Sequence, residues 1–127
     1  MILVDSSVWI AARRQPDGPD HRELQELIEA DEVMLAQPVR IELMAGVSNQ
    51  DRAKLRRALT ALPVALPTGE TWQLVESWIE QAAKAGHRFG MADYLIAAIA
   101  RERGALLWTM DKDFVQMERL KFVHLYR

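Results

Sequence analysis

The sequence contains no cysteine. Disulfide bonds, thiolate nucleophiles and thiolate metal sites are therefore excluded, which fits a cytoplasmic protein. Long hydrophobic runs are missing too. Asp5 interrupts the first apolar segment, so we expect no signal peptide. No other run approaches the roughly 20 residues that span a bilayer. We therefore expect a cytoplasmic protein that does not bind a membrane.

An excess of positive charge is also absent, because 16 basic and 18 acidic residues give a net charge of −2. A nucleic-acid partner would have to be bound through local patches and metal ions rather than through overall charge. Half of the residues are hydrophobic, which is enough for a buried core. The length of 127 residues fits one domain, 1–127.

Motifs of several enzyme classes are absent. The sequence has no glycine-rich phosphate loop and no Ser-His-Asp order. His21, His87 and His124 are isolated, and none has the spacing of metal ligands. The carboxylates are therefore the strongest candidates for chemistry in this chain.

Strand and helix patterns alternate along the chain. Short apolar segments predict strands at 2–4, 33–36, 63–67, 105–109 and 122–125. Helical patterns lie between them, beginning with a short helix that Ser6 or Ser7 would cap. The alternation predicts an α/β fold, with a mostly parallel sheet of four or five strands and helices on both faces. Such sheets bind ligands beyond the carboxyl ends of their strands, near the point where the strand order reverses.

Four acidic residues lie where an acid is locally unexpected: Asp5, Glu42, Asp93 and Asp111. Asp5 and Asp111 follow predicted strands, so both should lie at the carboxyl edge of the sheet. Glu42 and Asp93 lie in predicted helices and have small residues on the same side. We expect both helices to approach that edge closely through these small residues, which are Ala45 and Gly46, and Ala97 and Ala100.

If the fold brings the four acids together, they form a site for a hard divalent cation. Two unit charges ~4 Å apart repel by about 4 kcal/mol at an effective dielectric of 20, so clustered carboxylates are costly without a cation. Oxygen ligands without paired histidine or cysteine favour Mg²⁺ or Mn²⁺ over zinc. Asp113 is a nearby acid that either joins this site or only favours a helix dipole.

Each acid also has a purely structural explanation. Asp5 and Asp111 could be helix N-caps, whereas Asp93 could favour a helix dipole and Glu42 could be solvated. The basic run 52–57 is most simply a solvated helix face. Four other basic residues lie near predicted strand ends or acid-bearing segments and are candidates for binding substrate phosphates: Arg13, Arg14, Arg88 and Lys112.

Four segments carry a family resemblance when they are taken in order. They are Ile2-Leu3-Val4-Asp5-Ser6-Ser7, Ile41-Glu42-Leu43, residues 92–100 around Asp93, and residues 107–114 around Asp111. Together they resemble the PIN-domain family, and specifically its VapC-type toxins. The resemblance covers essentially the whole chain. Each segment alone is a weak pattern, whereas the order and spacing of all four are specific.

The resemblance implies a three-layer α/β/α sandwich in which the four acids form one pocket. It implies an endoribonuclease that depends on Mg²⁺ or Mn²⁺ and leaves 5′-phosphate and 3′-hydroxyl ends. Ser6 and Thr109 match hydroxyl positions that support the acids by hydrogen bonding, and Asp113 matches a frequent extra acid. VapC-type toxins typically form homodimers and are inhibited by a cognate VapB-like antitoxin that covers the active site.

Two other functions compete with this interpretation. A catalytically inactive PIN-like module would bind RNA or protein without cleavage, although an intact set of acids argues against it. A receiver domain or an aspartate-nucleophile phosphatase would also place an Asp at the end of a strand. The receiver needs a second Asp at the end of a central strand, but the third predicted strand ends in Pro67. The phosphatase needs Asp-x-Asp, but the third position is Ser7.

Overall fold

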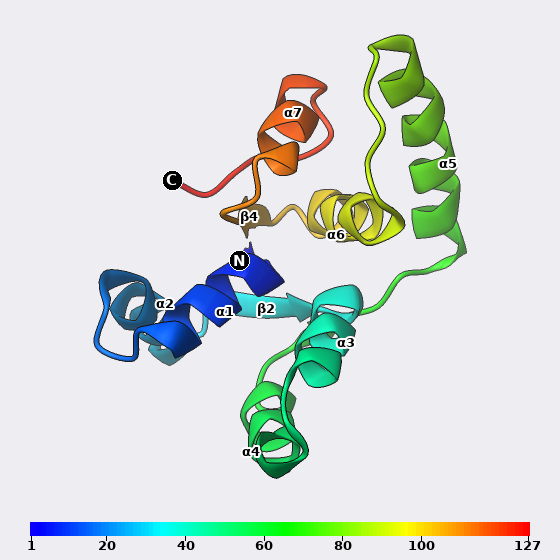
Figure 1. Cartoon of the computed structure of the whole chain (residues 1–127). Coiled ribbons are helices and arrows are strands. Elements are labelled where there is room, and N and C mark those ends of the chain that lie inside the picture. Colours follow the sequence, from blue (N-terminus) through cyan, green and yellow to red (C-terminus); the bar gives the residue numbers. More distant parts are fainter.

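The computed structural model describes all residues, 1–127, as alternating strands and helices (Figure 1). The strands are β1 (Ile2–Val4), β2 (Val33–Ala36), β3 (Val64–Ala65) and β4 (Leu106–Trp108). The helices are α1 (Ser6–Arg14), α2 (Pro19–Glu29), α3 (Gln37–Gly46), α4 (Asn49–Thr60), α5 (Gly69–Lys84), α6 (Met91–Glu102) and α7 (Asp113–Arg119). None of the helices is long and apolar enough to cross a membrane.

The four strands form one parallel sheet in the order β3-β2-β1-β4. The chain moves from β1 outward to β2 and β3, and it then returns to place β4 on the other side of β1. The strand order therefore reverses between β1 and β4, where Val4 pairs with Trp108. A ligand site is expected beyond the carboxyl ends of these two strands. The predicted strand between Pro63 and Pro67 forms β3, and its place at the sheet edge fits the flanking prolines, which cannot donate to a neighbouring strand.

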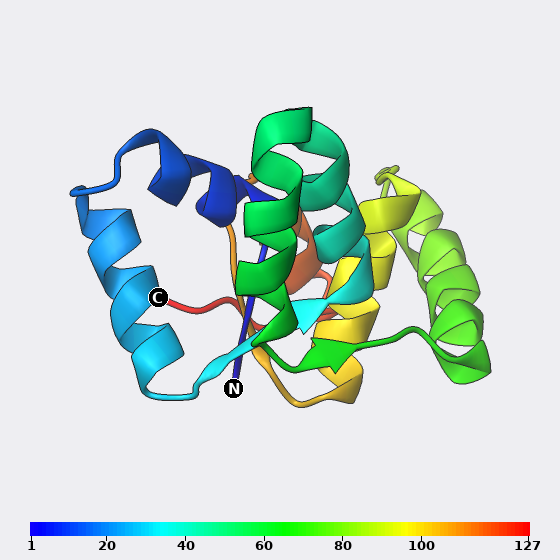
Figure 2. The same ribbon diagram turned by 90° about the horizontal axis from the view of Figure 1, so that it is seen from below.

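Both faces of the sheet are covered by helices, as the alternating pattern predicted. Ile2 and Val4 of β1 pack in a cluster with residues of α1 and α2, whereas Leu3 packs in a larger cluster with residues of α3, α5, α6 and α7. The alternation follows from the pleat, which directs successive side chains to opposite faces. Figures 1 and 2 show α2 and α5 at opposite ends of the molecule, with the sheet between them. The result is the three-layer α/β/α sandwich.

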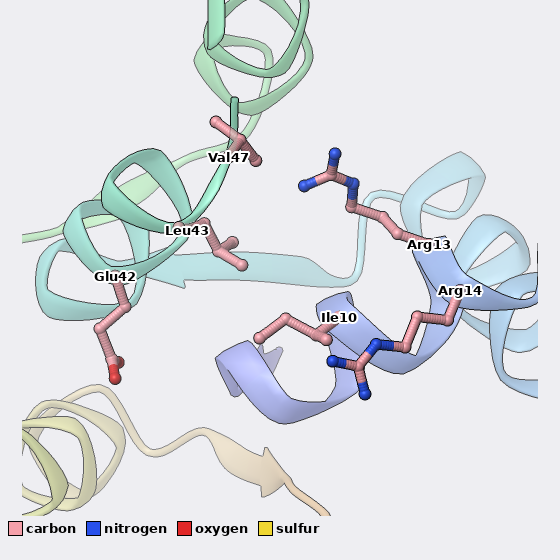
Figure 3. Close-up of a pocket in the computed structure, with 7 residues that line it drawn as sticks. Ile10, Arg13, Arg14, Glu42, Leu43 and Val47 are labelled. Atoms are coloured by element: carbon pink, nitrogen blue, oxygen red, sulfur yellow. The ribbon is translucent and has the colours of Figure 1, made fainter. Parts of the chain in front are cut away.

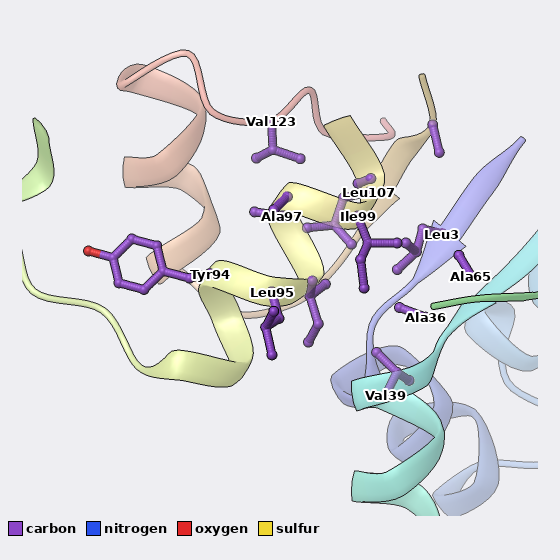
Figure 4. Packing of buried hydrophobic residues seen from close by; sticks show 14 of the residues in the cluster. Leu3, Ala36, Val39, Ala65, Tyr94, Leu95, Ala97, Ile99, Leu107 and Val123 are labelled. Carbon is purple, nitrogen blue, oxygen red and sulfur yellow. The ribbon is translucent and has the colours of Figure 1, made fainter. Parts of the chain in front are cut away.

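The most deeply packed helix is α6, in which every residue from Tyr94 to Ala100 is buried. Figure 4 shows its side chains packed beside Leu3 of β1 and Leu107 of β4. Ala97 and Ala100 are fully buried, as expected for a helix that approaches the sheet closely. This packing fixes the position of Asp93 in the first turn of α6.

The predicted last strand, 122–125, is wrong for most of its length. Only a single parallel bridge between Leu107 and Leu125 is present. Phe122 and Val123 are buried in the core instead, and the ring of Phe122 stacks on Trp78 with centroids 4.4 Å apart. Their side chains therefore fill space between helices, so the segment has apolar residues without forming a ladder.

Candidate active site

The carboxyl edge of the sheet gathers the acidic residues from four separate segments. Asp5 follows β1 directly, and its backbone N–H donates to the carbonyl of Trp108, the last residue of β4 (2.9 Å). Asp111 follows β4 by three positions. Glu42 lies on α3 and Asp93 on α6, two helices that contact each other. The sheet topology and the contact between α3 and α6 therefore place these acids close together.

Asp5 is the most enclosed of these acids, with only 4% of its surface exposed. Its Oδ2 accepts hydrogen bonds from the hydroxyls of Ser7 (2.7 Å) and Thr109 (2.9 Å). Its Oδ1 has no hydrogen-bond partner. Every buried side-chain oxygen or nitrogen atom in the protein has such a partner, so Oδ1 is not a buried atom. Oδ1 therefore remains open to solvent and free for a ligand. Asp5 occupies the N-cap position of α1 but makes no capping bond with its side chain, so capping does not explain it.

A series of hydrogen bonds extends from Asp5 to the segment after β4. The Thr109 hydroxyl accepts from the backbone N–H of Asp111 (3.0 Å), and Asp111 Oδ1 accepts from the N–H of Asp113 (2.9 Å). The Ser7 hydroxyl likewise accepts from the N–H of Met110 (3.0 Å). Asp111 is not the N-cap of α7, which is Lys112, and only its Oδ1 takes part in this local bonding. These bonds hold the acid-bearing loop against β1.

Ser7, rather than Ser6, supports Asp5 in the structure. Ser6 forms no side-chain hydrogen bond, whereas Ser7 donates to Asp5 and accepts from Met110. The local sequence does not distinguish the two serines, because the other partners of Ser7, which are Met110 and Thr109, lie more than 100 positions away. Thr109 has the hydrogen-bonding position that the resemblance implied.

Three of the acids are close enough to share one cation. Carboxylate oxygens of Asp93, Asp111 and Asp113 all lie within 4.8 Å of one another. Asp5 and Glu42 lie outside this trio, although both are near enough to act electrostatically on Asp93. The donor set consists only of oxygen and is negatively charged, which fits Mg²⁺ or Mn²⁺. Asp113, whose role was open from sequence, is placed beside the other acids.

The acids alter one another's protonation. Burial, together with the negative charges of Asp111, Asp5, Asp113 and Glu42, raises the pKa of Asp93 to about 6. Partial burial, together with the charge of Asp5, also raises the pKa of Glu42. Both increases show carboxylates that are destabilised in the ionised form by their surroundings. A bound divalent cation would relieve this repulsion.

Glu42 has a different setting from the one its small neighbours suggested. Ala45 and Gly46 are exposed, so they do not pack α3 closely on the sheet edge. Gly46 instead lines a cleft of about 390 Å³ between α1 and α3, whose other walls are Ile10, Arg13, Arg14, Glu42, Leu43 and Val47 (Figure 3). The carboxylate of Glu42 points from α3 toward α6 at one end of this cleft. The cleft therefore adjoins the acidic residues.

The four predicted phosphate-binding residues do not lie together. Arg13 and Arg14 both line the cleft beside Glu42. Arg88 lines a separate, mostly apolar pocket between α5 and α6, with Val75, Ile79 and Phe89 among its neighbours. Lys112 is exposed immediately before α7 and lines neither of these two pockets. The apolar residues of the cleft, which sequence reasoning missed, have no distinguishing pattern in the chain.

Removing the hydroxyls that hold Asp5 should weaken the site. Thr109→Val keeps the shape of the side chain but removes both the donor to Asp5 and the acceptor for Asp111. We expect a loss of metal affinity of about 10–100-fold, the usual cost when a supporting partner of a ligand is lost. Titration calorimetry with Mn²⁺ would measure this loss.

The two neighbouring serines provide a matched comparison. The structure predicts a similar loss of Mn²⁺ affinity for Ser7→Ala and a much smaller one for Ser6→Ala, whereas the family pattern predicts the reverse. A larger effect of Ser6→Ala would contradict the hydrogen bonds described above.

Metal binding should weaken in acid, because Asp93 has a pKa of about 6. Protonation of Asp93 competes with the cation below this pH, whereas above it the carboxylate is already ionised. We therefore expect Mn²⁺ affinity to be nearly constant above pH 7 and to fall about tenfold per pH unit below pH 6. Electron paramagnetic resonance of free Mn²⁺ at several pH values would follow this. Constant affinity from pH 5 to 7.5 would exclude Asp93 as a ligand.

Comparisons with known proteins agree with this architecture. A family model described as "PIN domain" matches residues 2–120. No curated protein matches the chain by sequence. Among solved structures, the chain is similar to VapBC2 from Rickettsia felis bound to a promoter DNA fragment (TM-score 0.82, 21% identity, covering 99% of this chain and 98% of that one). It is similar to DNA-bound VapBC from Salmonella typhimurium (TM-score 0.79, 18% identity, 98% and 96%).

The chain is also similar to VapC20 from Mycobacterium tuberculosis, a sarcin-ricin loop cleaving toxin (TM-score 0.66, 19% identity, 92% and 95%). At these identities the solved structures establish a shared fold. The family model adds a match to the sequence itself, and it spans nearly the entire chain. The residue order, the sheet topology and the family match agree, and this chain belongs to the PIN domain family.

Proposed function

We propose that this protein is a metal-dependent endoribonuclease and the toxin of a toxin–antitoxin pair. One observation carries the proposal. Asp5, Glu42, Asp93 and Asp111 come from four separate segments, and burial together with the charges of the other three raises the pKa of Asp93. Stability alone does not favour such a cluster of like charges, so a function that uses it is required. Family membership and the fold shared with VapBC structures support a toxin nuclease.

In this proposal the acids hold one or two Mg²⁺ or Mn²⁺ ions. Asp93, Asp111 and Asp113 are the ligands closest to one another, and Asp5 presents its free Oδ1 from the end of β1. When bound, the ion supplies a Lewis acid that activates water and offsets the charge developing on the phosphate. Ser7 and Thr109 fix the orientation of the Asp5 carboxylate. This carboxylate therefore does not have to be ordered when the ion binds or during the reaction. Glu42 adds a further negative charge on the side of the site that adjoins the cleft.

The proposed partners follow from the same family. A cognate VapB-like antitoxin would cover the acidic site in the cytoplasm, and the toxin would be a homodimer. The solved structures that share the fold include VapBC complexes, which supports a partner of this kind. The proposed substrate is single-stranded or loop RNA, because a recessed acidic pocket is poorly accessible to a duplex.

Cleavage of total cellular RNA by the purified protein tests the proposal. We expect a few discrete cuts with Mg²⁺ or Mn²⁺ and none in EDTA, and restoring the metal should restore cleavage. The new ends should carry 5′-phosphates, which ligation-based sequencing detects. If folded protein that is free of antitoxin cuts nothing with either metal, the catalytically inactive PIN-like binding module becomes the better assignment.

A further inference from the structure

The cleft between α1 and α3 combines two unpaired cations with an apolar floor. Arg13 and Arg14 lie in the last turn of α1, and both guanidinium groups extend toward the α3 side (Figure 3). Neither side chain forms a hydrogen bond within the protein, and the chain's one ion pair joins Arg127 to Glu118. A favourable helix dipole explains basic residues at this end of α1. It does not explain two guanidinium groups that face a cleft without forming an ion pair.

Apart from Glu42 at one end, the remaining walls of the cleft are apolar or lack a side chain. Ile10 is 41% exposed, and Leu43 and Val47 lie opposite on the α3 side. Gly46 leaves open space, since beyond its chain neighbours and the backbone of its own helix no atom lies within 4 Å of the position that a Cβ would occupy. The volume of about 390 Å³ is near the lower end of the range for ligand sites. It suits one nucleotide unit and is too small for a duplex.

The cleft is continuous with the acidic site. Ser6, Ile10 and Arg14 are spaced four residues apart, so they form one stripe along α1. From Ser6 to Arg14 the helix rises about 12 Å, which places the arginines a short distance from the acids. Glu42 belongs to both regions, since it lines the cleft and its charge acts on Asp93. A ligand in the cleft would therefore extend directly to the carboxylates.

We propose that this cleft is the subsite for an unpaired RNA nucleotide next to the scissile phosphate, an inference that rests on the proposed nuclease function. Arg13 and Arg14 bind the phosphates that flank this nucleotide, and Ile10, Leu43 and Val47 contact its sugar or base. Guanidinium groups suit phosphate geometry because their N–H donors form paired hydrogen bonds. The two positive charges also offset the repulsion between RNA and the acidic site. An unpaired nucleotide fits because only an unstacked base can enter so small a cleft.

Removing both arginines tests the phosphate contacts without turnover. Binding of a fluorescent single-stranded octanucleotide is measured by anisotropy in EDTA, over a range of salt concentrations. For Arg13→Gln/Arg14→Gln we expect affinity to fall on the order of tenfold. The slope of log affinity against log salt should become less steep by about 1.4, because two phosphate contacts are lost. The control Arg57→Gln/Arg103→Gln removes two exposed, unpaired arginines outside the cleft and should change neither the affinity nor the slope.

Filling the cleft tests its shape independently of charge. Gly46→Leu adds a side chain into open space and should leave folding intact, because leucine is favoured over glycine in a helix. We expect RNA affinity to fall by a similar factor, with the salt slope unchanged. Gly69→Leu, at the start of α5 and also in open space, is the matched control.

The outcomes separate the subsite from the nuclease. If the arginine pair and Gly46→Leu leave RNA binding unchanged while wild-type protein still cuts RNA with metal, the subsite is overturned and the nuclease stands. If they weaken RNA binding as expected but no metal supports cleavage, the subsite stands and the nuclease fails. If RNA binding is unchanged but the variants lose binding to a co-expressed antitoxin, the cleft is a protein site and the nucleotide subsite is overturned.

Discussion

Replacing Asp5 with asparagine is expected to lower the proposed RNA cleavage by at least about 100-fold, because Asp5 is proposed to bind the metal directly rather than to support another ligand. The substitution is nearly isosteric. The amide oxygen can accept the hydrogen bonds that Ser7 and Thr109 now donate to Oδ2. The amide NH₂ would then face the position of the free Oδ1, where it cannot bind a cation. We therefore expect a folded protein that has lost metal affinity and activity together.

A matched control separates this loss from any general effect of the substitution. Asp31 lies before β2, near the amino-terminal ends of the strands and therefore opposite the acidic site. Its backbone has a left-handed conformation (φ 57°) that asparagine tolerates well. Asp31→Asn should retain full activity and a similar melting temperature. Single-turnover cleavage and Mn²⁺ calorimetry on both variants would test the prediction. Activity of Asp5→Asn within a few fold of wild type would show that Asp5 is not a ligand.

Replacing Asp93 with asparagine is expected to abolish activity and, unusually, to stabilise the metal-free protein. The pKa of Asp93 is raised from 3.8 to about 6, so the folded state holds its proton more tightly than the unfolded state does. Stability is therefore lost as pH rises through this range, and the full penalty is present above pH 6. The shift corresponds to about 3 kcal/mol before screening. Because the side chain keeps solvent contact, we expect Asp93→Asn to gain about 1–2 kcal/mol at pH 8.

Metal should reverse this order of stability. A divalent cation at about 100 times its dissociation constant would stabilise the wild type by about 2.7 kcal/mol. The Asp93→Asn variant should gain far less, because it has lost a proposed ligand. Thermal unfolding at pH 8 would show that Asp93→Asn has the higher melting temperature in EDTA and the wild type has the higher one in Mn²⁺. Glu42→Gln should change stability in the same direction but less, since Glu42 is more exposed. If Asp93→Asn is less stable than the wild type in EDTA, the ionised carboxylate of Asp93 does not destabilise the metal-free protein, and the prediction is wrong.

The features that could be predicted best from the sequence are those that depend on one short segment and on the spacing of its apolar residues. The buried runs at β1, β2 and β4 and the acids that follow β1 and β4 were placed correctly, because a parallel strand has a recognisable apolar core and its carboxyl end is a known ligand edge. The buried alanines of α6 likewise follow from helical periodicity. Local pattern was sufficient in each of these cases.

Features that depend on packing between distant segments were harder to predict. Phe122 and Val123 have the composition of a strand but fill the core, because Trp78 offers a stacking surface that no local pattern reveals. Gly46 lines a cleft and does not form a close contact between helices, because the arrangement of α1 and α3 determines which residues lie opposite Gly46. The choice of Ser7 over Ser6 depends on where Met110 lies, more than 100 residues away.

The bonds between β1 and β4 have a consequence for the order in which the acidic site forms during folding. Asp5 and Thr109 lie 104 positions apart, and Asp111 and Asp113 are held by the same segment after β4. Contacts of such long range form late in folding, because the chain between them must first be ordered. A partly folded protein in which β4 has not yet paired with β1 therefore lacks two of the five carboxylates and one of the two hydroxyls that orient Asp5. The last strand to join the sheet also completes the acidic centre, so a folding intermediate without β4 has no complete site.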